Sequence, residues 1–429
     1  MSKRKLNFDT LQIHVGQKVD LQNGSTAVPI YQTSAFRFDT FDDAKAVSAY
    51  EKFGYNYTRF RNPTQTAFEN RIAALEGGTA ALSTSSGMAA ITYSLLNILS
   101  QGDEIIAADT LYAGTHTTFS NLFSNMGIKT HFVNPNNIED FKKYINEKTK
   151  AIYAESIGNP GINIIDIEAL SKLANDNQIP LIIDNTFATP YLFNPIKYGA
   201  NIVVHSATKF IGGHGSTIGG VIVEGGNFNW AESGKFPGFT NPVCNESSYY
   251  DAYKDTAFIT KARSQLMGTL GATLSPFNAF MLLQGVETLS LRMKKHVFNA
   301  QKIAEFLDAS DKVSWVNYPG LKSSKYYELG KKYFPKGPGS ILTFGLKGGL
   351  DNIKKFIDNL EIFSLVTNIG DIKSLVVHPA TTTHVELSEE EQLLAGVTPD
   401  LIRMSVGIED IDDLIFDLEQ SLNKLNYIK

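Results

Sequence analysis

The alternation of helical and short apolar segments between residues 64 and about 225 constrains the fold more than any other feature. The helical segments are 66–76, 87–99 and 167–177, and the apolar runs are 103–108, 130–133, 151–154, 181–184, 201–204 and 220–223. Strands that lack polar alternation are buried on both faces, as in a mostly parallel sheet covered by helices. The sequence therefore predicts an α/β domain, and such sheets bind ligands beyond the carboxyl ends of their strands.

The segments that flank this pattern predict a further division of the chain. Residues 1–62 show little helical periodicity and are interpreted as an arm that packs on a neighbouring subunit. Residues 225–268 are aromatic and rich in turn residues, which favours a lid or binding loop over disorder. From Ser275 a long amphipathic helix is expected to run toward Leu307 and to lead into a second α+β region.

The length of 429 residues is large for one core, so two domains are expected behind the arm. Strand-like segments at 341–345 and 401–406 mark the second, smaller one. We predict an arm at 1–62, a large domain at 63–289 that includes the insertion 225–268, and a small C-terminal domain at 290–429.

Composition and charge exclude several classes of function. The net charge of −5 comes without a basic block, which argues against a nucleic-acid partner. Cys244 is the single cysteine, so neither an intramolecular disulfide nor a cysteine-only zinc site is possible. No run approaches the ~18 apolar residues of a membrane span, and no apolar region follows the basic start, so we expect a cytoplasmic protein without a membrane partner.

Metal and nucleotide sites find no support in the motifs. The histidines at 205, 214, 378 and 384 lack the HExxH spacing, and no cysteine pairs join them, so no metal is assigned. Neither a P-loop nor a G-x-G-x-x-G sequence after a strand is present.

Lys209 and Asp184 follow buried strands and are the first candidates for chemistry. Lys209 stands after the run 201–204, beside the hydroxyls of Ser206 and Thr208 and before a glycine cluster. A lysine there can hold an aldehyde cofactor as a Schiff base while the hydroxyls hold its phosphate. An aspartate at the end of a parallel strand can pair with a protonated pyridine nitrogen. Taken singly, Lys209 could also be a solvated lysine and Asp184 a loop cap.

Other candidate residues could have an ordinary structural role instead of a functional one. The segment Ser85–Met88 opens a helical pattern and could be an anion site or an ordinary N-cap. Tyr112 could stack on a flat ring or lie in the core, and Asn159 could be turn chemistry. Arg403 could grip an α-carboxylate through two parallel hydrogen bonds or lie at a sheet edge.

The sequence Ser206-Ala-Thr-Lys209 also matches the S-x-x-K motif of acyl-serine enzymes. That reading requires K-T-G and S-D-N elements, and the chain contains neither. The motif also normally opens a helix, whereas glycines follow here at 212, 213 and 215. An acyl-serine hydrolase is therefore kept as a distant alternative.

Eight short sequence motifs, taken in the order in which they occur in the chain, resemble those of one family. They are Tyr57-Thr-Arg59, Ser86-Gly-Met88, Leu111-Tyr112, Asn159-Pro160, Asp184-Asn-Thr-Phe187, His205-Ser-Ala-Thr-Lys209, Lys373-Ser-Leu375 and Arg403-Met-Ser-Val-Gly407. The family is the pyridoxal 5'-phosphate (PLP)-dependent enzymes of cysteine and methionine metabolism, the cystathionine γ-synthase group. The resemblance covers essentially the whole chain and implies fold type I of the PLP-dependent transferases, which is aspartate aminotransferase-like.

The resemblance implies a cofactor site made by residues from several motifs. Lys209 would form the Schiff base and later move protons, Asp184 would pair with the ring nitrogen, and Tyr112 would stack on the ring. Asn159 would contact the phenolate oxygen of the cofactor. The residues expected to hold the phosphate are Ser86, Gly87, Met88, Ser206 and Thr208, with Tyr57 and Arg59 reaching it from a neighbouring subunit.

For the substrate, the resemblance implies that Arg403 and the backbone near Ser374 hold the carboxylate, with Asn159 and Tyr57 nearby. It also implies a homo-oligomer, a tetramer of paired dimers, whose active sites are shared across a dimer interface.

Within the group, the chain is most similar to the O-acetylhomoserine sulfhydrylases. The segment 370–384 is similar in sequence to the corresponding segment of that subfamily. The insertion 225–268 resembles an extra segment that enzymes of the subfamily contain. Gly114 stands where methionine γ-lyases typically have a cysteine. We therefore expect O-acetyl-L-homoserine and sulfide to give L-homocysteine and acetate. Cystathionine γ-synthase or γ-lyase chemistry on the same site is the alternative, and the preferred ester and the sulfur donor stay open.

Overall fold

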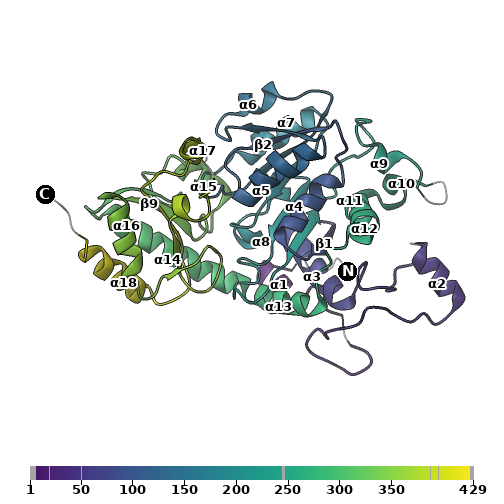
Figure 1. Cartoon of the computed structure of the whole chain (residues 1–429). Helices are drawn as coiled ribbons and strands as arrows, with labels where there is room; N and C mark the ends of the chain where they lie inside the picture. Colours follow the sequence, from purple (N-terminus) through teal and green to yellow (C-terminus); the bar gives the residue numbers. More distant parts are fainter. Residues whose placement is uncertain are drawn as a thin grey trace.

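The computed structural model describes residues 6–425 apart from 19, 50, 244–246, 387 and 395, so Cys244 lies outside the described residues. The chain forms two sheets with separate apolar cores (Figure 1). No helix among the described residues is long and apolar enough to cross a membrane.

The larger sheet has seven strands in the order β1-β7-β6-β5-β4-β2-β3. Their bounds are β1 Ala80–Thr84, β2 Glu104–Ala108, β3 Lys129–Val133, β4 Thr149–Glu155, β5 Leu181–Asp184, β6 Ile202–Ser206 and β7 Gly220–Glu224. Strands β3, β2, β4, β5 and β6 pair in parallel, and β7 runs antiparallel to both of its neighbours. The predicted mostly parallel sheet is confirmed; β1 was not predicted.

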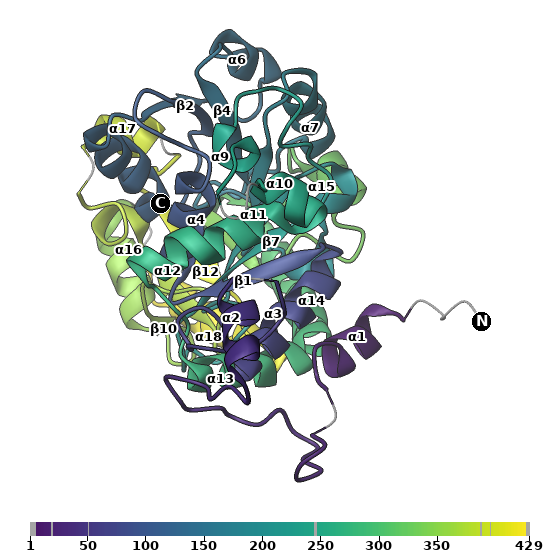
Figure 2. The same ribbon diagram turned by 90° about the vertical axis from the view of Figure 1, so that its right-hand side faces the viewer.

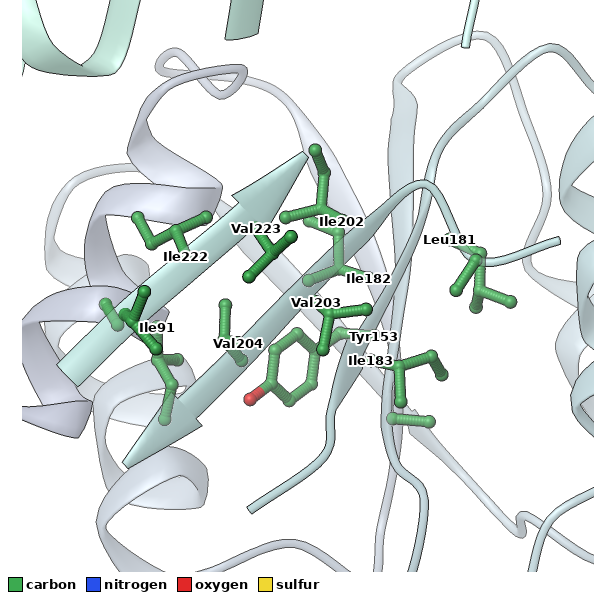
Figure 3. Close-up of a cluster of buried hydrophobic side chains, with 14 of the residues drawn as sticks. Ile91, Tyr153, Leu181, Ile182, Ile183, Ile202, Val203, Val204, Ile222 and Val223 are labelled. Atoms are coloured by element: carbon green, nitrogen blue, oxygen red, sulfur yellow. The ribbon is translucent and has the colours of Figure 1, made fainter. Parts of the chain in front are cut away.

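Helices cover this sheet and close its core. They are α3 Pro63–Glu76, α4 Gly87–Leu96, α5 Ala113–Thr117 with its π-helical continuation η1 Thr118–Phe123, α6 Ile138–Lys143, α7 Ile167–Asp176 and α8 Thr189–Leu192. Helix α4 packs on β6 and β7, and α7 packs on β4 and β5. Figure 3 shows the buried side chains between the layers, with Ile91 of α4 near Val204 and Ile222. Because both faces are covered, these strands contain almost no polar alternation.

The insertion 225–268 is built mostly from short helices rather than from an open loop. These are α9 Pro237–Thr240, α10 Tyr249–Tyr253 and α11 Ala257–Lys261, followed by η4 Ala262–Met267 and α12 Gly268–Leu270. Trp230 lies in its centre, stacked on Phe239 at 4.3 Å and on Phe258 at 5.3 Å between ring centroids. Figures 1 and 2 place these helices on the side of the large sheet away from the second sheet. The expectation of a lid is therefore wrong, because these aromatic side chains are buried in the same apolar core as the large sheet.

The predicted long helix from 275 to 307 is broken into two. Helix α13 spans Pro276–Glu287 and α14 spans Leu289–Asp308, with Thr288 at φ −115° and ψ 10° between them. Helix α14 then leads into the second sheet, whose strand order is β10-β11-β12-β9-β8. Its strands are β8 Val313–Asn317, β9 Ile341–Leu346, β10 Ser364–Leu365, β11 Leu375–Val377 and β12 Leu401–Ser405, and its helices are α15 Tyr327–Tyr333, α16 Gly349–Asp358, α17 Glu389–Leu394 and α18 Ile411–Asn423.

The N-terminal segment has two short helices, α1 Phe8–His14 and α2 Phe41–Ser48. Figure 1 shows α2 at the tip of an excursion that leaves the body of the molecule, and Phe41 on it is 84% exposed. Such an exposed aromatic arm needs a surface to cover it, which is the reason we keep the arm as a proposed subunit contact.

Candidate active site

One cavity of about 870 Å³ lies at the carboxyl ends of β4, β5 and β6, as the topology of the sheet requires. Lys209 and Asp184 both line it, and Arg403 reaches it from β12 of the second sheet. Asp184 and Arg403, which are 219 positions apart in the sequence, thus line the same cavity.

Lys209 lies in the turn after β6, where its backbone N–H donates to the carbonyl of Ser206 at 3.1 Å. Burial lowers the pKa of Lys209 to about 8, and the nearby charge of Arg403 acts in the same direction. Its Nζ donates a hydrogen bond to the side-chain oxygen of Asn368. The lysine is therefore partly neutral near pH 8, as a nucleophile or a base must be.

Asp184 is the last residue of β5, and its carboxylate accepts a hydrogen bond from the backbone N–H of Thr186 at 2.9 Å. Burial raises the pKa of Asp184, and it raises the pKa of Glu155 well above its usual range, with the charge of Asp184 as the second cause. Because two buried carboxyl groups this close resist double ionisation, we assign the shared proton to Glu155.

Glu155 positions the loop that carries Tyr112. Its Oε1 accepts a hydrogen bond from the backbone N–H of Tyr112 at 2.7 Å. The Tyr112 side chain is 47% exposed and lines the cavity. A Cβ atom added to Gly114 would lie 2.6 Å from the Tyr112 ring, so the glycine leaves the ring its place.

The N-terminus of α4 forms an anion cradle on another wall. Ser86 is the N-cap, and its hydroxyl accepts from the backbone N–H of Ala89 at 3.1 Å. The N–H groups of the first helical turn point out of the helix end, where the dipole favours negative charge. Ser206 and Thr208 line the same cavity. A Cβ atom on Gly87 would lie 2.5 Å from Cβ of Ser206, so only glycine lets α4 come this close.

Arg403 is buried with only neutral hydrogen-bond partners. It donates to the side-chain oxygen of Asn159 at 3.0 Å and to the carbonyl of Asn368 at 3.4 Å. Its Nε has no partner, and no carboxylate lies within ion-pair distance of it, among the residues that the structure describes. Burial lowers its pKa to about 10, so it stays charged. A buried, unpaired guanidinium facing a cavity is suited to a carboxylate ligand.

Three predicted residues lie elsewhere. Tyr57 and Arg59 line a separate concave surface with residues 271–276 and do not reach Lys209 within one chain. Ser374 is fully buried directly before β11, with its N–H donating to Glu409 at 2.6 Å and its hydroxyl to the same carboxylate at 2.9 Å. We therefore correct the expectation for Ser374, because its polar groups are used inside the small domain and Asn368 and Ile369 line the cavity instead.

Sequence reasoning missed Asn368 and His384. Both line the cavity from irregular segments of the small domain. Burial lowers the pKa of His384 to about 4, helped by the charge of Arg403, so the ring is neutral. Neither residue follows a predicted strand, so no periodic pattern pointed to them.

The S-x-x-K reading does not match the geometry. Ser206 is the last residue of β6 and Lys209 lies in a turn, so the serine does not open a helix. Among the described residues, no cluster of three or more histidine, cysteine, aspartate or glutamate side chains could hold a metal ion.

The donor set fits PLP. A helix N-terminus with hydroxyls suits a phosphate, a partly neutral lysine suits an aldehyde, and a buried aspartate suits a pyridinium nitrogen.

Comparisons with known proteins agree with this geometry. A model of the family described as Cys/Met metabolism PLP-dependent enzyme matches residues 9–423. The O-acetyl-L-homoserine sulfhydrylase of Leptospira meyeri is 49% identical over 433 aligned positions that cover 98% of each chain. The homocysteine synthase of Schizosaccharomyces pombe is 46% identical, with 97% of this chain and 98% of that protein covered.

Two solved structures have the same fold. A Campylobacter jejuni protein assigned as an O-acetylhomoserine (thiol)-lyase, crystallised with N'-pyridoxyl-lysine-5'-monophosphate, has a TM-score of 0.95 and 38% identity, and covers 98% of this chain and 100% of that one. The metB structure of Corynebacterium glutamicum has a TM-score of 0.84 and 35% identity, with 98% and 99% covered.

Proposed function

Because the chain belongs to the Cys/Met metabolism PLP-dependent enzymes, we propose that it replaces the acetate of O-acetyl-L-homoserine by sulfide to give L-homocysteine. The observation that carries the proposal is the single cavity lined by Lys209, Asp184 and Arg403, with the N-terminus of α4 beside them. Such an enzyme needs a lysine, a carboxylate, an anion cradle and a carboxylate-binding cation in one space.

The cofactor is PLP, which when bound supplies an aldehyde for amines and a ring that withdraws electrons from the substrate α-carbon. We propose that Ser86, Ser206 and Thr208 hold its phosphate with the backbone of Gly87 and Met88. Asp184 holds the proton on the ring nitrogen, Tyr112 stacks on the ring, and Asn159 contacts the ring oxygen.

Two basic residues hold and deprotonate the substrate, and they have different tasks. Arg403 binds the α-carboxylate, which supplies the counter-charge that the buried guanidinium lacks. Nζ of Lys209 takes the α proton and then moves a proton at the β carbon, so that acetate leaves from the γ carbon and sulfide adds there. The low pKa of Lys209, about 8, keeps enough of it neutral to act as this base.

The small number of cationic side chains in the cavity supports acetyl over charged esters. Lys209 and Arg403 are the only cationic side chains among the described residues that line it, and both already have partners in the proposal. The outer wall contains Thr382 and Thr383 beside the neutral His384. A succinyl or phospho ester would bring an extra negative charge without a counter-charge, which costs binding energy.

The arm completes the site in an oligomer. Tyr57 and Arg59 line an exposed concavity in one chain, and in the proposed assembly they reach the phosphate of a neighbouring subunit. This arrangement gives a reason for an arm without its own core. We propose that the chain is divided into an arm at 1–62, a PLP-binding domain at 63–289 and a small domain at 290–429.

The test uses purified protein with PLP. We expect a visible absorption band that Lys209→Ala removes, and homocysteine from O-acetylhomoserine and sulfide. Succinyl and phospho homoserine should react more slowly, and cysteine in place of sulfide should give little cystathionine. A colourless protein after PLP is added would refute the cofactor assignment, whereas cystathionine as the main product would move the activity to the synthase.

A further inference from the structure

The insertion 225–268 and the residues directly after it hold helix α4 at several points. Figures 1 and 2 show α11 and α12 beside α4, and η4, which joins these two helices, packs on it. In the part of the chain that the structure describes, no residue of the insertion lines the cavity. The N-terminus of α4 is the anion cradle of that cavity, so the insertion can act on the site only through the position of this helix.

Lys261, the last residue of α11, binds the C-terminal end of α4. It is 8% exposed, and its Nζ donates to the backbone carbonyl of Asn97, the C-cap of α4, at 2.7 Å and to the side-chain oxygen of Asn97 at 3.4 Å. The amide of Asn97 in turn donates to the carbonyl of Phe258 at 3.0 Å. Carbonyl groups at the end of a helix lack partners within the helix, so a lysine supplies the donor they need.

The hydrogen bonds to Asn97, rather than packing, distinguish lysine from an apolar residue at position 261. Burial lowers the pKa of Lys261 to about 8, and the Phe239 ring lies 5.2 Å from its Nζ. Among the described residues, no carboxylate lies within ion-pair distance of this amine. A polar group without a charge partner is costly to bury, and an apolar side chain of similar length would fill the same space without that cost.

Two further hydrogen bonds hold the middle and the start of α4. The hydroxyl of Tyr93 donates to the carbonyl of Gly271 at 2.8 Å. The backbone N–H of Ser85, directly before the N-cap of the helix, donates to the carbonyl of Ala272 at 2.6 Å. One continuous stretch, 258–272, therefore bonds to the start, the middle and the end of α4.

We propose that the stretch 258–272 fixes the position of α4 and thereby aims its N-terminus at the cofactor phosphate, with Lys261 as the anchor at the far end. Because a ten-residue helix is stiff, a shift at its C-terminus is transmitted to its N-terminus. Lys261 is then a positioning residue, since it does not line the cavity. The inference rests on the proposed function, and it gives a task to the insertion, for which the expectation of a lid was wrong.

The test compares Lys261→Met with the matched control Lys150→Met. Nζ of Lys150 also donates to a backbone carbonyl, that of Lys235 in the insertion, at 2.7 Å, and it lies 3.6 Å from Asp103. None of these contacts reaches α4. Both variants therefore remove a lysine that bonds to the main chain, and only one of them releases the helix.

The measurement compares PLP with pyridoxal, which lacks the phosphate. Dissociation constants of both are determined by absorbance on the apoprotein in phosphate-free buffer, and thermal unfolding verifies that each variant is folded. For Lys261→Met we expect PLP to bind about tenfold more weakly and pyridoxal to stay within about twofold, because only the phosphate uses the cradle. In Lys150→Met both values should stay within about twofold of the parent protein.

Tyr93→Phe provides the second variant if Lys261→Met does not fold. It removes the hydroxyl that donates to Gly271 and keeps the ring, so the packing of the helix is retained. We expect PLP to bind about threefold more weakly, again with pyridoxal unchanged.

Equal losses for PLP and pyridoxal, or an equal loss of PLP affinity in Lys150→Met, would overturn the inference, because the damage would not be specific to the cradle. Unchanged PLP affinity in folded Lys261→Met would also overturn it and leave a lysine that only stabilises the insertion. Failure of the proposed function would appear elsewhere, in the parent protein, as the absence of a Lys209-dependent absorption band.

Discussion

The side-chain oxygen of Asn368 accepts a hydrogen bond from Nζ of Lys209 and so joins the small domain to the turn after β6. The carbonyl of the same asparagine accepts from Arg403 at 3.4 Å. Two residues on, the main chain of Gly370 approaches so closely that an added Cβ would lie 2.7 Å from the backbone nitrogen of Phe210. Lys209, the proposed base, and Arg403, which is proposed to bind the substrate carboxylate, are thus connected through one short segment between β10 and β11.

The first prediction concerns the pH dependence of cofactor uptake by the apoprotein. A Schiff base forms from a neutral amine, and the pKa of Lys209 is lowered to about 8 from the ordinary 10.5 by burial and by Arg403. We expect the rate of PLP uptake to level off above pH 8 and to fall about tenfold per unit below it. Stopped-flow absorbance measures the rate. A midpoint near 10.5 would contradict the lowered value.

Substitution of Asn368 tests the contact with Lys209. Asn368→Asp places a negative charge beside the lysine, which favours the charged amine, so the midpoint of PLP uptake should move to higher pH. Asn368→Ala removes the acceptor without adding charge and serves as the control. Identical midpoints in the two variants would mean that residue 368 does not contact the lysine in solution.

Arg403 should affect both the substrate and the lysine. Arg403→Gln removes two charged hydrogen bonds to the carboxylate, and we expect KM for O-acetylhomoserine to rise by about 10- to 100-fold. Because the charge of Arg403 lowers the pKa of Lys209, the midpoint of PLP uptake should rise as well. Arg403→Lys keeps the charge but loses the planar fork, so KM should rise while the midpoint stays. An unchanged KM in Arg403→Gln would remove the arginine from the substrate site.

Because α4 closely approaches β6, adding one methyl group at Gly87 should weaken PLP binding. In Gly87→Ala the new Cβ would lie 2.5 Å from Cβ of Ser206, so the helix end must retreat and the anion cradle opens. We expect PLP affinity to fall by at least about tenfold. Gly330→Ala adds a methyl group inside helix α15, where the nearest atom is 3.3 Å away, and should leave PLP binding unchanged. Equal affinities in the two variants would show that the cradle tolerates the methyl group.

Gly114 should affect PLP binding only through the position of the Tyr112 ring. The Cβ of Gly114→Ala would lie 2.6 Å from the Tyr112 ring, which must then tilt away from the cofactor. A lost ring stack corresponds to about 3- to 10-fold weaker PLP binding. In a Tyr112→Ala background, the same change at Gly114 should have no further effect. Additive effects would show that the glycine acts on something other than the ring.

Subunit mixing tests whether the arm completes a neighbouring site. Arg59→Ala and Lys209→Ala should each be inactive alone. If the site is shared, equal mixing with free exchange in a symmetric dimer restores about a quarter of the active sites. If mass spectrometry demonstrates exchange and no activity is recovered, Arg59 does not complete the site of a neighbouring subunit.

The sequence alone predicted the alternation of helices and strands and the functional residues at the strand ends. The parallel strands appear in the structure where apolar runs were identified, because burial on both faces leaves a continuous signal. Lys209, Asp184 and Ser206 followed from the same rule, since the ends of such strands meet at one edge. The resemblance added Arg403, which lines the same cavity.

Other features depended on contacts between distant segments. β1 pairs with β7 about 140 residues later, and nothing local marks that pairing. The long helix ended at Thr288 although its apolar pattern continued, because α13 packs on α3 while α14 turns toward the second sheet. The insertion became a helical unit because its aromatic rings pack on one another.

The chain's local pattern was therefore enough for the class of fold, the cofactor and the edge of the sheet where the chemistry lies. It was not enough for Asn368, for the position of Ser374, or for the contact between Glu76 and His205, which are 129 residues apart. Periodicity reports whether a side chain is buried, and burial repeats along a strand or helix. The identity of a buried polar partner depends on the path of the chain between two elements, and no repeating pattern encodes that path.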